Sequence, residues 1–346
     1  MRRNSFTFLC GIDAKEVKHK RVTRQFVSLH NEDSYVKPQQ APNAAEGEEN
    51  MEFTDVISGQ NITKRFKKFV LEIPELHIPK GFATALIGEN GAGKTTLMNI
   101  LSGIRLDYKG ELRYFDEQER DVDKVKERLG YTGPGLYFLP HWNLKQVAEV
   151  SGLLFDTFDR VRYEQICQEL GIGEGDQKKT VAKLSDGNKM KLVLASVLAR
   201  RTDCLLMDEP ASPLDPLMRD KLCEIIREYL DAGNGEHSVF FSTHNIADME
   251  NVTDYCLILE HGKIVEQGFV EELKEKYLLV KGEPGDAEAA KKILYSFSGS
   301  SYGFEGICLA ENLNRLAGMD VKVETATLSQ ISIAILKNHT SLKLQA

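Results

Sequence analysis

Residues 88–96 read Gly-Glu-Asn-Gly-Ala-Gly-Lys-Thr-Thr and fit the pattern G-x-x-x-x-G-K-[ST]. The apolar run Ala83 to Ile87 before them predicts a buried strand, and the run Thr96 to Leu101 after them predicts a helix. In this order, backbone N–H groups and the positive helix N-terminus can surround phosphate oxygens. We therefore expect phosphate to bind the whole loop, which comprises Gly88, Glu89, Asn90, Gly91, Ala92, Gly93, Lys94, Thr95 and Thr96.

Two side chains of this loop have separate expected roles. Lys94 would reach the β- and γ-phosphates of a nucleotide, and Thr95 would place its hydroxyl on Mg²⁺. A nucleoside triphosphate is therefore the expected ligand. The use made of its energy has to be inferred from other residues.

Composition restricts the classes of function. The chain has 346 residues, of which 42% are hydrophobic and 28% charged, as in an ordinary globular protein. Its formal net charge of -8 does not favour a general nucleic-acid surface. No apolar run approaches the roughly 20 residues that span a bilayer. The six cysteines are scattered without a C-x-x-C pair, which favours reduced thiols over disulfides or a zinc site.

Three parts of the chain differ in pattern. Residues 1–50 lack sustained periodicity and are predicted to be mostly disordered. Residues 51–280 alternate short apolar strands with amphipathic helices, which predicts an α/β domain with a partly parallel sheet. Helical periodicity replaces the strands over about residues 136–200. Residues 281–346 predict a small α/β appendage.

Some individual elements can also be expected. Phe53 to Ile62 and Phe69 to Ile78 predict an initial β layer. In the appendage, Ala287 to Leu294 and Leu328 to Leu336 predict helices, and Phe304 to Leu309 predicts a strand.

Two adjacent carboxylates follow a second apolar strand. Asp208 comes directly after Leu205 to Met207 and is expected to hold Mg²⁺ through water, because hard cations prefer carboxylate oxygens. Glu209 is placed to polarise an attacking water as a general base. The alternative is an acidic strand end in a loop, which the neighbouring phosphate loop disfavours.

The run Leu184 to Asn188 opens a predicted long helix. Ser185 suits the N-cap of that helix. The functional alternative is that the Ser185 hydroxyl and the helix N-terminus contact the γ-phosphate.

Two further motifs complete the set. Ser242-Thr243-His244 follows an apolar strand, and we expect His244 to reach the γ-phosphate rather than to serve as a structural or exposed histidine. Ser212 to Asp215 is either a proline turn capped by aspartate or a subunit-contact loop, and its fixed distance from Glu209 favours the second.

The order of these motifs resembles an ATP-binding cassette (ABC) ATPase over about residues 52–280. The resemblance implies a RecA-like α/β core with an antiparallel β subdomain and a helical subdomain. It also implies that ATP lies between two head-to-tail cassettes, identical or different, so that Ser185 and Gly187 of one face the phosphate loop of the other. His244 then matches the γ-phosphate sensor. Phe66 matches the aromatic residue that stacks on adenine, with a position in a strand core as an equal alternative.

Two departures from the family pattern stand out. Asp186 and Asn188 replace a glycine and the glutamine of the usual Leu-Ser-Gly-Gly-Gln signature. Pro134 lies where a glutamine normally touches Mg²⁺ and the attacking water. Mg²⁺ would then rely on Thr95, Asp208 and water.

The variant signature, the run Leu136 to Trp142 and Thr327-Leu328-Ser329 resemble the bacterial ABC-2-type exporter ATPases. That resemblance implies a cytoplasmic ATPase subunit that drives a separate membrane permease, at the inner face of the plasma membrane. Leu136 to Trp142 would dock the permease, or else belong to the helical core. A cassette ATPase acting on ribosomes or nucleic acid is disfavoured by the single cassette and the acidic balance. A weakly catalytic regulator is disfavoured by the intact catalytic residues.

Overall fold

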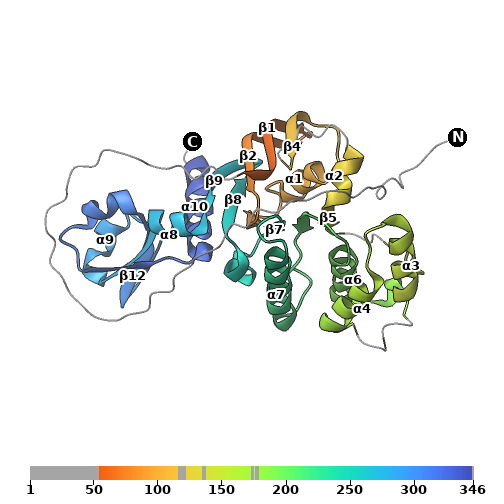
Figure 1. The fold of residues 1–346 in the computed structure, drawn as a ribbon. Helices are drawn as coiled ribbons and strands as arrows, with labels where there is room; N and C mark the ends of the chain where they lie inside the picture. Colours follow the sequence, from red (N-terminus) through yellow and green to blue (C-terminus); the bar gives the residue numbers. More distant parts are fainter. Residues whose placement is uncertain (1–53, 116–121, 135–137, 173–174, 176–178, 345–346) are drawn as a thin grey trace.

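The computed structural model describes residues 54–115, 122–134, 138–172, 175 and 179–344 (Figure 1). The predicted disorder of residues 1–50 falls outside these residues. Three β-sheets organise the described chain, with six, three and four strands. In Figure 1 the four-stranded sheet forms a lobe beside the other two, with helix α10 between.

The six-stranded sheet has the order β5-β6-β7-β3-β8-β9, and only the edge strand β9 runs antiparallel to its neighbour. Every residue of β3, β6 and β7 is buried. Such continuous apolar strands are typical of a parallel sheet covered on both faces. The strands are β3 Ala83–Ile87, β5 Leu129–Thr132, β6 Cys204–Asp208, β7 Ser238–Thr243, β8 Tyr255–Glu260 and β9 Lys263–Phe269.

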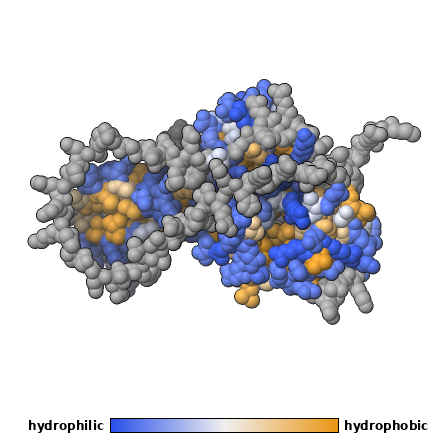
Figure 2. Space-filling model, in the orientation of Figure 1, coloured by the Kyte–Doolittle hydropathy of each residue, from blue (hydrophilic) through white to orange (hydrophobic). Residues whose placement is uncertain are grey.

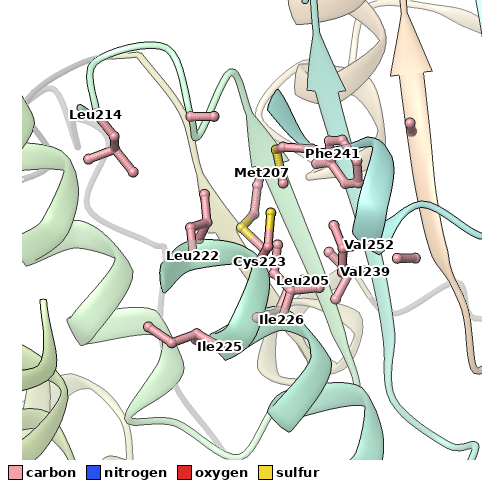
Figure 3. Packing of buried hydrophobic residues seen from close by; sticks show 14 of the residues in the cluster. Leu205, Met207, Leu214, Leu222, Cys223, Ile225, Ile226, Val239, Phe241 and Val252 are labelled. Carbon is pink, nitrogen blue, oxygen red and sulfur yellow. The ribbon is translucent and has the colours of Figure 1, made fainter. Parts of the chain in front are cut away.

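Side chains alternate between the two faces of this sheet. Leu206 and Phe240 join the core beneath helix α1 (Lys94–Leu101) and the three-stranded sheet. Leu205 and Met207 join the opposite core, where helix α7 (Pro216–Ala232) packs. Figure 3 shows the α7 residues Leu222, Cys223 and Ile226 gathered against these β6 side chains.

The three-stranded sheet is antiparallel, with the order β2-β1-β4. Its strands are β1 Asp55–Arg65, β2 Val70–Pro79 and β4 Lys109–Tyr114. Both predicted strands of the initial β layer are confirmed. Helix α2 (Val122–Arg128) follows it and leads into β5.

A helical region separates β5 from β6. It consists of α3 Leu144–Leu154, α4 Arg160–Glu169, the 3₁₀ turn η1 Val181–Lys183 and α6 Asp186–Leu198. Side chains of Asn143, Asp159 and Ser185 cap the three α-helices. In the run Leu136 to Trp142, the first two residues fall outside the described chain. Phe138 and Trp142 pack against the core, whereas Leu139 is 39% exposed.

After β8 and β9 the chain forms α8 and then the four-stranded antiparallel sheet, with the order β11-β12-β10-β13. The chain order strand, helix, two strands, helical turn and strand is that of a ferredoxin-like unit. Apolar side chains of β10 and β12, among them Val280 and Phe304, belong to a small hydrophobic core within the appendage. The elements are α8 Val270–Lys276, β10 Tyr277–Gly282, η4 Pro284–Asp286, α9 Ala287–Ala290, β11 Tyr295–Ser300, β12 Gly303–Leu309, η5 Ala310–Leu316, β13 Val321–Thr325 and α10 Leu328–Leu344.

Two expectations for the appendage need correction. Its sheet begins at Tyr277, ahead of the expected boundary at residue 281. The predicted helix from Ala287 to Leu294 ends at Ala290, because a turn follows that brings Leu294 into the small core. The predicted strand from Phe304 and the predicted helix from Leu328 are confirmed.

The surface of the described chain is largely hydrophilic in Figure 2, with an apolar area on the lobe of the appendage. No helix within the described ranges is long and apolar enough to cross a membrane.

Candidate nucleotide-binding site

The register of the parallel strands brings the predicted motifs to one edge of the six-stranded sheet. Ile87 at the end of β3 pairs with Thr243 at the end of β7. Asp208 at the end of β6 pairs with Ser242, also in β7. The residues that follow each strand therefore emerge together at the carboxyl ends, where open α/β sheets bind ligands.

A cavity of about 560 Å³ opens at this edge. It contains most of the predicted site residues, together with three that were given no role in ATP binding or hydrolysis: Phe69, Pro134 and Ser212. Its lining comprises Phe69, Glu89, Asn90, Gly91, Gly93, Lys94, Thr95, Thr96, Pro134, Glu209, Ser212 and His244. Six other predicted residues are not among the described residues that line it: Phe66, Gly88, Ala92, Ser185, Gly187 and Asp208.

The phosphate loop is held in place by its glycines and by backbone hydrogen bonds. Gly93 has a φ of 112°, in the left-handed region that favours glycine. A Cβ atom on Gly88 would lie 2.4 Å from the carbonyl oxygen of Leu259, so no larger residue fits without moving β8. The Gly88 N–H donates to the carbonyl of Thr243 at 3.2 Å, which ties the loop to β7.

Helix α1 begins at Lys94, directly after the loop, with Gly93 at its N-cap. Glycine has no side chain that could accept hydrogen bonds from the first N–H groups of the helix. These donors and the positive end of the helix dipole are therefore available to an anion at the cavity.

The Lys94 side chain points into the site from a buried position, with 6% of its surface exposed. Its Nζ donates to the carbonyls of Gly88 at 2.7 Å and Glu89 at 3.3 Å. It also lies 3.2 Å from Oε1 of Glu209. The ammonium group is thus held by this chain's own oxygens at the place where phosphate is expected.

Asp208 is completely buried. Burial raises the pKa of its carboxyl, while the nearby Ser242 and Thr95 hydroxyls lower it less. Ser242 Oγ donates to Oδ1 at 2.5 Å. In the described chain, Oδ2 is a buried oxygen with no hydrogen-bond partner by the usual geometric criteria.

The orphan oxygen of Asp208 suits a small hard cation. Mg²⁺ is usually held by one or two protein oxygens together with substrate phosphates and water. The Thr95 hydroxyl and the Asp208 carboxylate supply such oxygens beside the cavity. The residues present therefore fit Mg²⁺.

Glu209 adopts an unusual backbone conformation, with a φ of 53° in the left-handed region. This conformation costs a residue other than glycine on the order of 1–3 kcal/mol and is common at functional sites. Its N–H donates to Ser242 Oγ at 3.0 Å, and its Oε2 lies 2.7 Å from Nδ1 of His244. The turn aims the carboxylate into the cavity.

The helix that carries the variant signature starts as predicted. Ser185 Oγ accepts the N–H of Asn188 at 3.2 Å, so the expected N-cap is confirmed. A Cβ atom on Gly187 would lie 2.9 Å from the carbonyl oxygen of Pro213, which places the helix start beside the loop after Glu209. Asp186 pairs with Lys189 at 2.8 Å on the exposed surface.

Phe66 follows the end of β1 and is 41% exposed. The alternative of a strand-core position is therefore wrong. Cations of Lys64 and Arg105 each lie 5.3 Å from its ring centre. Phe69 lies closer to the loop, because a Cβ atom on Gly93 would be 2.7 Å from its Cζ.

Among the residues that sequence reasoning left without a role in ATP binding or hydrolysis are Ser242 and Phe69. Ser242 bonds both Asp208 and Glu209, and its position opposite Asp208 in the parallel register was the available signal. Phe69 lines the cavity, and nothing in its sequence position distinguished it from a strand residue. Pro134, noted as a departure from the family pattern, also lines the cavity.

Comparison with known proteins agrees with this geometry. The family described as "ABC transporter" matches residues 71–212. The tungstate uptake system ATP-binding protein TupC of Peptoclostridium acidaminophilum is 30% identical over 61% of this chain and 97% of its own length. A lantibiotic transport ATP-binding protein, SrtF of Streptococcus pyogenes, is 32% identical over 60% of this chain and 87% of its own. A further relative, an uncharacterised ABC transporter ATP-binding protein of a Nostoc strain, is 31% identical over 63% of this chain and 66% of its own.

Solved structures show the same fold. The ATP-binding subunit of an ABC transporter superposes with a TM-score of 0.55 at 20% identity, over 63% of this chain and 92% of that one. A dimeric ATP-binding cassette with bound ADP and phosphate superposes with a TM-score of 0.54 at 19% identity, over 62% of this chain and 98% of that one. The chain therefore belongs to the ATP-binding proteins of the ABC transporter family, and it is an ABC ATPase with a RecA-like core.

Proposed function

We propose that this ATPase is the motor subunit of a transporter, in which it drives a separate membrane permease for export. The observation that carries the proposal is the single cavity that gathers the phosphate loop, Glu209 and His244 at one sheet edge.

Each residue of the site has a defined task in the proposed reaction. The backbone of the loop and Lys94 bind the phosphates of ATP. Glu209 takes a proton from the attacking water, as its 2.7 Å contact with His244 orients the carboxylate toward the cavity. His244 also contacts the γ-phosphate. Phe66 stacks on the adenine.

Thr95 and Asp208 would hold Mg²⁺, since they supply the hard oxygen ligands beside the cavity. When bound, the ion neutralises charge on the β- and γ-phosphates. Ser242 keeps the Asp208 carboxylate in place through its 2.5 Å hydrogen bond.

The site would be completed by a second cassette. Ser185 and Gly187 lie outside the cavity lining in the described chain, although their helix N-terminus is suited to contact an anion. In a head-to-tail pair of the same or different cassettes, these residues would face the partner's ATP. Closure of the pair on ATP and reopening after hydrolysis would move the permease.

The exporter assignment rests on likeness to particular relatives. A bacitracin transport ATP-binding protein, BcrA of Enterococcus faecalis, is 27% identical over 70% of this chain and 78% of its own. With the lantibiotic relative it supports the ABC-2-type group, whereas the tungstate relative belongs to an uptake system. The motor would work at the cytoplasmic face of the plasma membrane, where the exposed Leu139 is a candidate docking residue.

The catalytic assignment can be tested with Glu209→Gln. Removal of the general base should lower kcat by about 10²–10⁴-fold, while ATP binding persists and the ATP-bound dimer accumulates. Turnover and dimerisation would be followed by phosphate release and light scattering. Glu236→Gln is the control, because the Glu236 side chain lies on the surface, 71% exposed, and pairs there with Lys80. Wild-type turnover of Glu209→Gln would refute the mechanism.

The partner can be tested by affinity purification of the full chain from detergent-solubilised cells. A multi-span membrane protein in stoichiometric amount supports the motor function. Co-purification with ribosomes or nucleic acid instead would replace it by the soluble cassette alternative.

A further inference from the structure

Helix α10 of the appendage begins with an unusually complete set of partners for its backbone N–H groups. Thr327 is the N-cap residue, and its Oγ1 accepts the N–H of Gln330 at 3.2 Å. The Gln330 side chain in turn accepts the N–H of Thr327 at 2.9 Å. This reciprocal capping box leaves the N–H groups of Leu328 and Ser329 to be satisfied by another residue.

Both of these N–H groups donate to one carboxylate outside the appendage. Leu328 N donates to Oε1 of Glu250 at 2.7 Å, and Ser329 N donates to Oε2 at 3.3 Å. A carboxylate is stabilised here because the N-terminus of a helix carries partial positive charge. Glu250 therefore binds α10 with both oxygens.

Glu250 belongs to the segment that directly follows the catalytic-site histidine. This segment contains the short 3₁₀ turns η2 (Ile246–Asp248) and η3 (Glu250–Val252), which lie two to eight residues after His244. The Asn245 side chain donates to Asp248 at 3.0 Å, which closes the first turn. The position of His244 thus depends on where these two turns are held.

The opposite side of the segment is held by α7. Arg219 donates through one nitrogen to Asp248 at 2.6 Å and through Nε to the carbonyl of Leu214 at 2.9 Å. Leu214 lies in the loop after Glu209. The segment is therefore fixed by two clamps, Arg219 from the catalytic domain and Glu250 toward the appendage.

Apolar packing follows the same connection. Ile246 and Met249 of the segment are buried in one core together with Leu328 and Ile331 of α10. Figure 3 shows Val252 at the end of the segment, near Val239 and Phe241 of β7. Movement of α10 would therefore move the segment, because close-packed side chains transmit displacement.

We propose that Glu250 is a positioning residue for ATP hydrolysis, which makes the placement of His244 depend on helix α10 of the appendage. The appendage then acts on the rate of hydrolysis without touching the nucleotide. This inference rests on the proposed role of His244.

The test compares two variants that weaken the contact from opposite sides. Glu250→Gln removes the charge from the segment, and Thr327→Ala removes the N-cap of α10 without touching the segment. We expect both to lower kcat by about fivefold, with KM for ATP unchanged. About fivefold is the factor by which loss of a helix cap commonly changes the equilibrium between the capped and the frayed helix start. Amide exchange of residues 245–252 should accelerate by a similar factor in both variants.

Each variant has a matched control. Glu288→Gln changes an exposed glutamate on α9, and Thr325→Ala changes an exposed threonine on β13. Both should keep wild-type kcat and exchange. All assays are made well below the unfolding temperature, so that a general loss of stability does not alter kcat.

The outcomes separate this inference from the proposed function. If Glu250→Gln retains wild-type kcat and exchange while His244→Ala loses turnover, the positioning role is refuted and the role of His244 stands. If Glu250→Gln slows turnover and Thr327→Ala does not, the dependence on α10 is refuted. Wild-type turnover of His244→Ala would refute the assignment of His244 itself.

Discussion

Replacement of Lys94 by alanine isolates the contribution of the phosphate loop. Its Nζ donates to the Gly88 carbonyl at 2.7 Å and lies 3.2 Å from Oε1 of Glu209. Alanine deprives both groups of this cation. Loss of a buried hydrogen-bond partner of this kind lowers the free energy of unfolding by about 1–3 kcal/mol.

The effect on ATP binding is larger and more specific. ATP at one hundred times its Kd adds about 2.7 kcal/mol to the free energy of unfolding. For a chain of this size, that corresponds to a rise in Tm of about 5 °C. If Lys94→Ala weakens ATP binding by about a hundredfold, the same ATP concentration adds only about 0.4 kcal/mol, or about 1 °C.

Thermal unfolding with and without Mg-ATP measures this difference. Lys80→Ala is the control, because Lys80 pairs with the exposed Glu236 at the surface, and such surface ion pairs contribute about 0–1 kcal/mol. The control should keep the full ATP-induced rise in Tm. A rise of about 5 °C in Lys94→Ala as well, equal to that of the wild type, would refute the phosphate-binding role of Lys94.

Two further predictions concern the adenine and the metal ligand. Phe66→Ala should raise the Kd for ATP, measured by calorimetry, by about three- to tenfold if its ring stacks on the base. The same measurement on Phe69→Ala shows which of the two aromatic rings contacts the base. Asp208→Asn should abolish Mg-dependent hydrolysis yet stabilise the chain without nucleotide in urea. Burial raises the pKa of Asp208, which means that the ionised carboxylate destabilises the folded state. The gain in the free energy of unfolding from Asp208→Asn should therefore grow as pH rises above the usual aspartate range and vanish at lower pH.

Much of the site could be predicted because each part lies on a short stretch of sequence. Gly88 to Thr96 carries its own strand, loop and helix, and Asp208-Glu209 ends an apolar strand. Ser242 illustrates the limit of that reasoning. Its hydrogen bond to Asp208 joins residues 34 positions apart and exists only because β6 and β7 are parallel neighbours in this register.

The appendage was harder to predict because its strands carry weak signals. Strand β11 reads Tyr-Ser-Phe-Ser-Gly-Ser, in which only two large side chains mark the alternation. Strand β10 begins at Tyr277, four residues before the boundary expected at residue 281. The contact of helix α10 with Glu250 of the catalytic domain joins residues 78 positions apart, and no local sequence pattern indicates such a pair.

The contacts of Glu209 relate the proposed general base to the proposed ATP site. Both carboxylate oxygens of Glu209 have partners, Oε1 near Lys94 at 3.2 Å and Oε2 near His244 at 2.7 Å. Lys94 and His244 are both among the residues expected to contact phosphate. Phosphate bound by these residues as proposed would therefore lie beside the Glu209 carboxylate, where the attacking water has to be positioned.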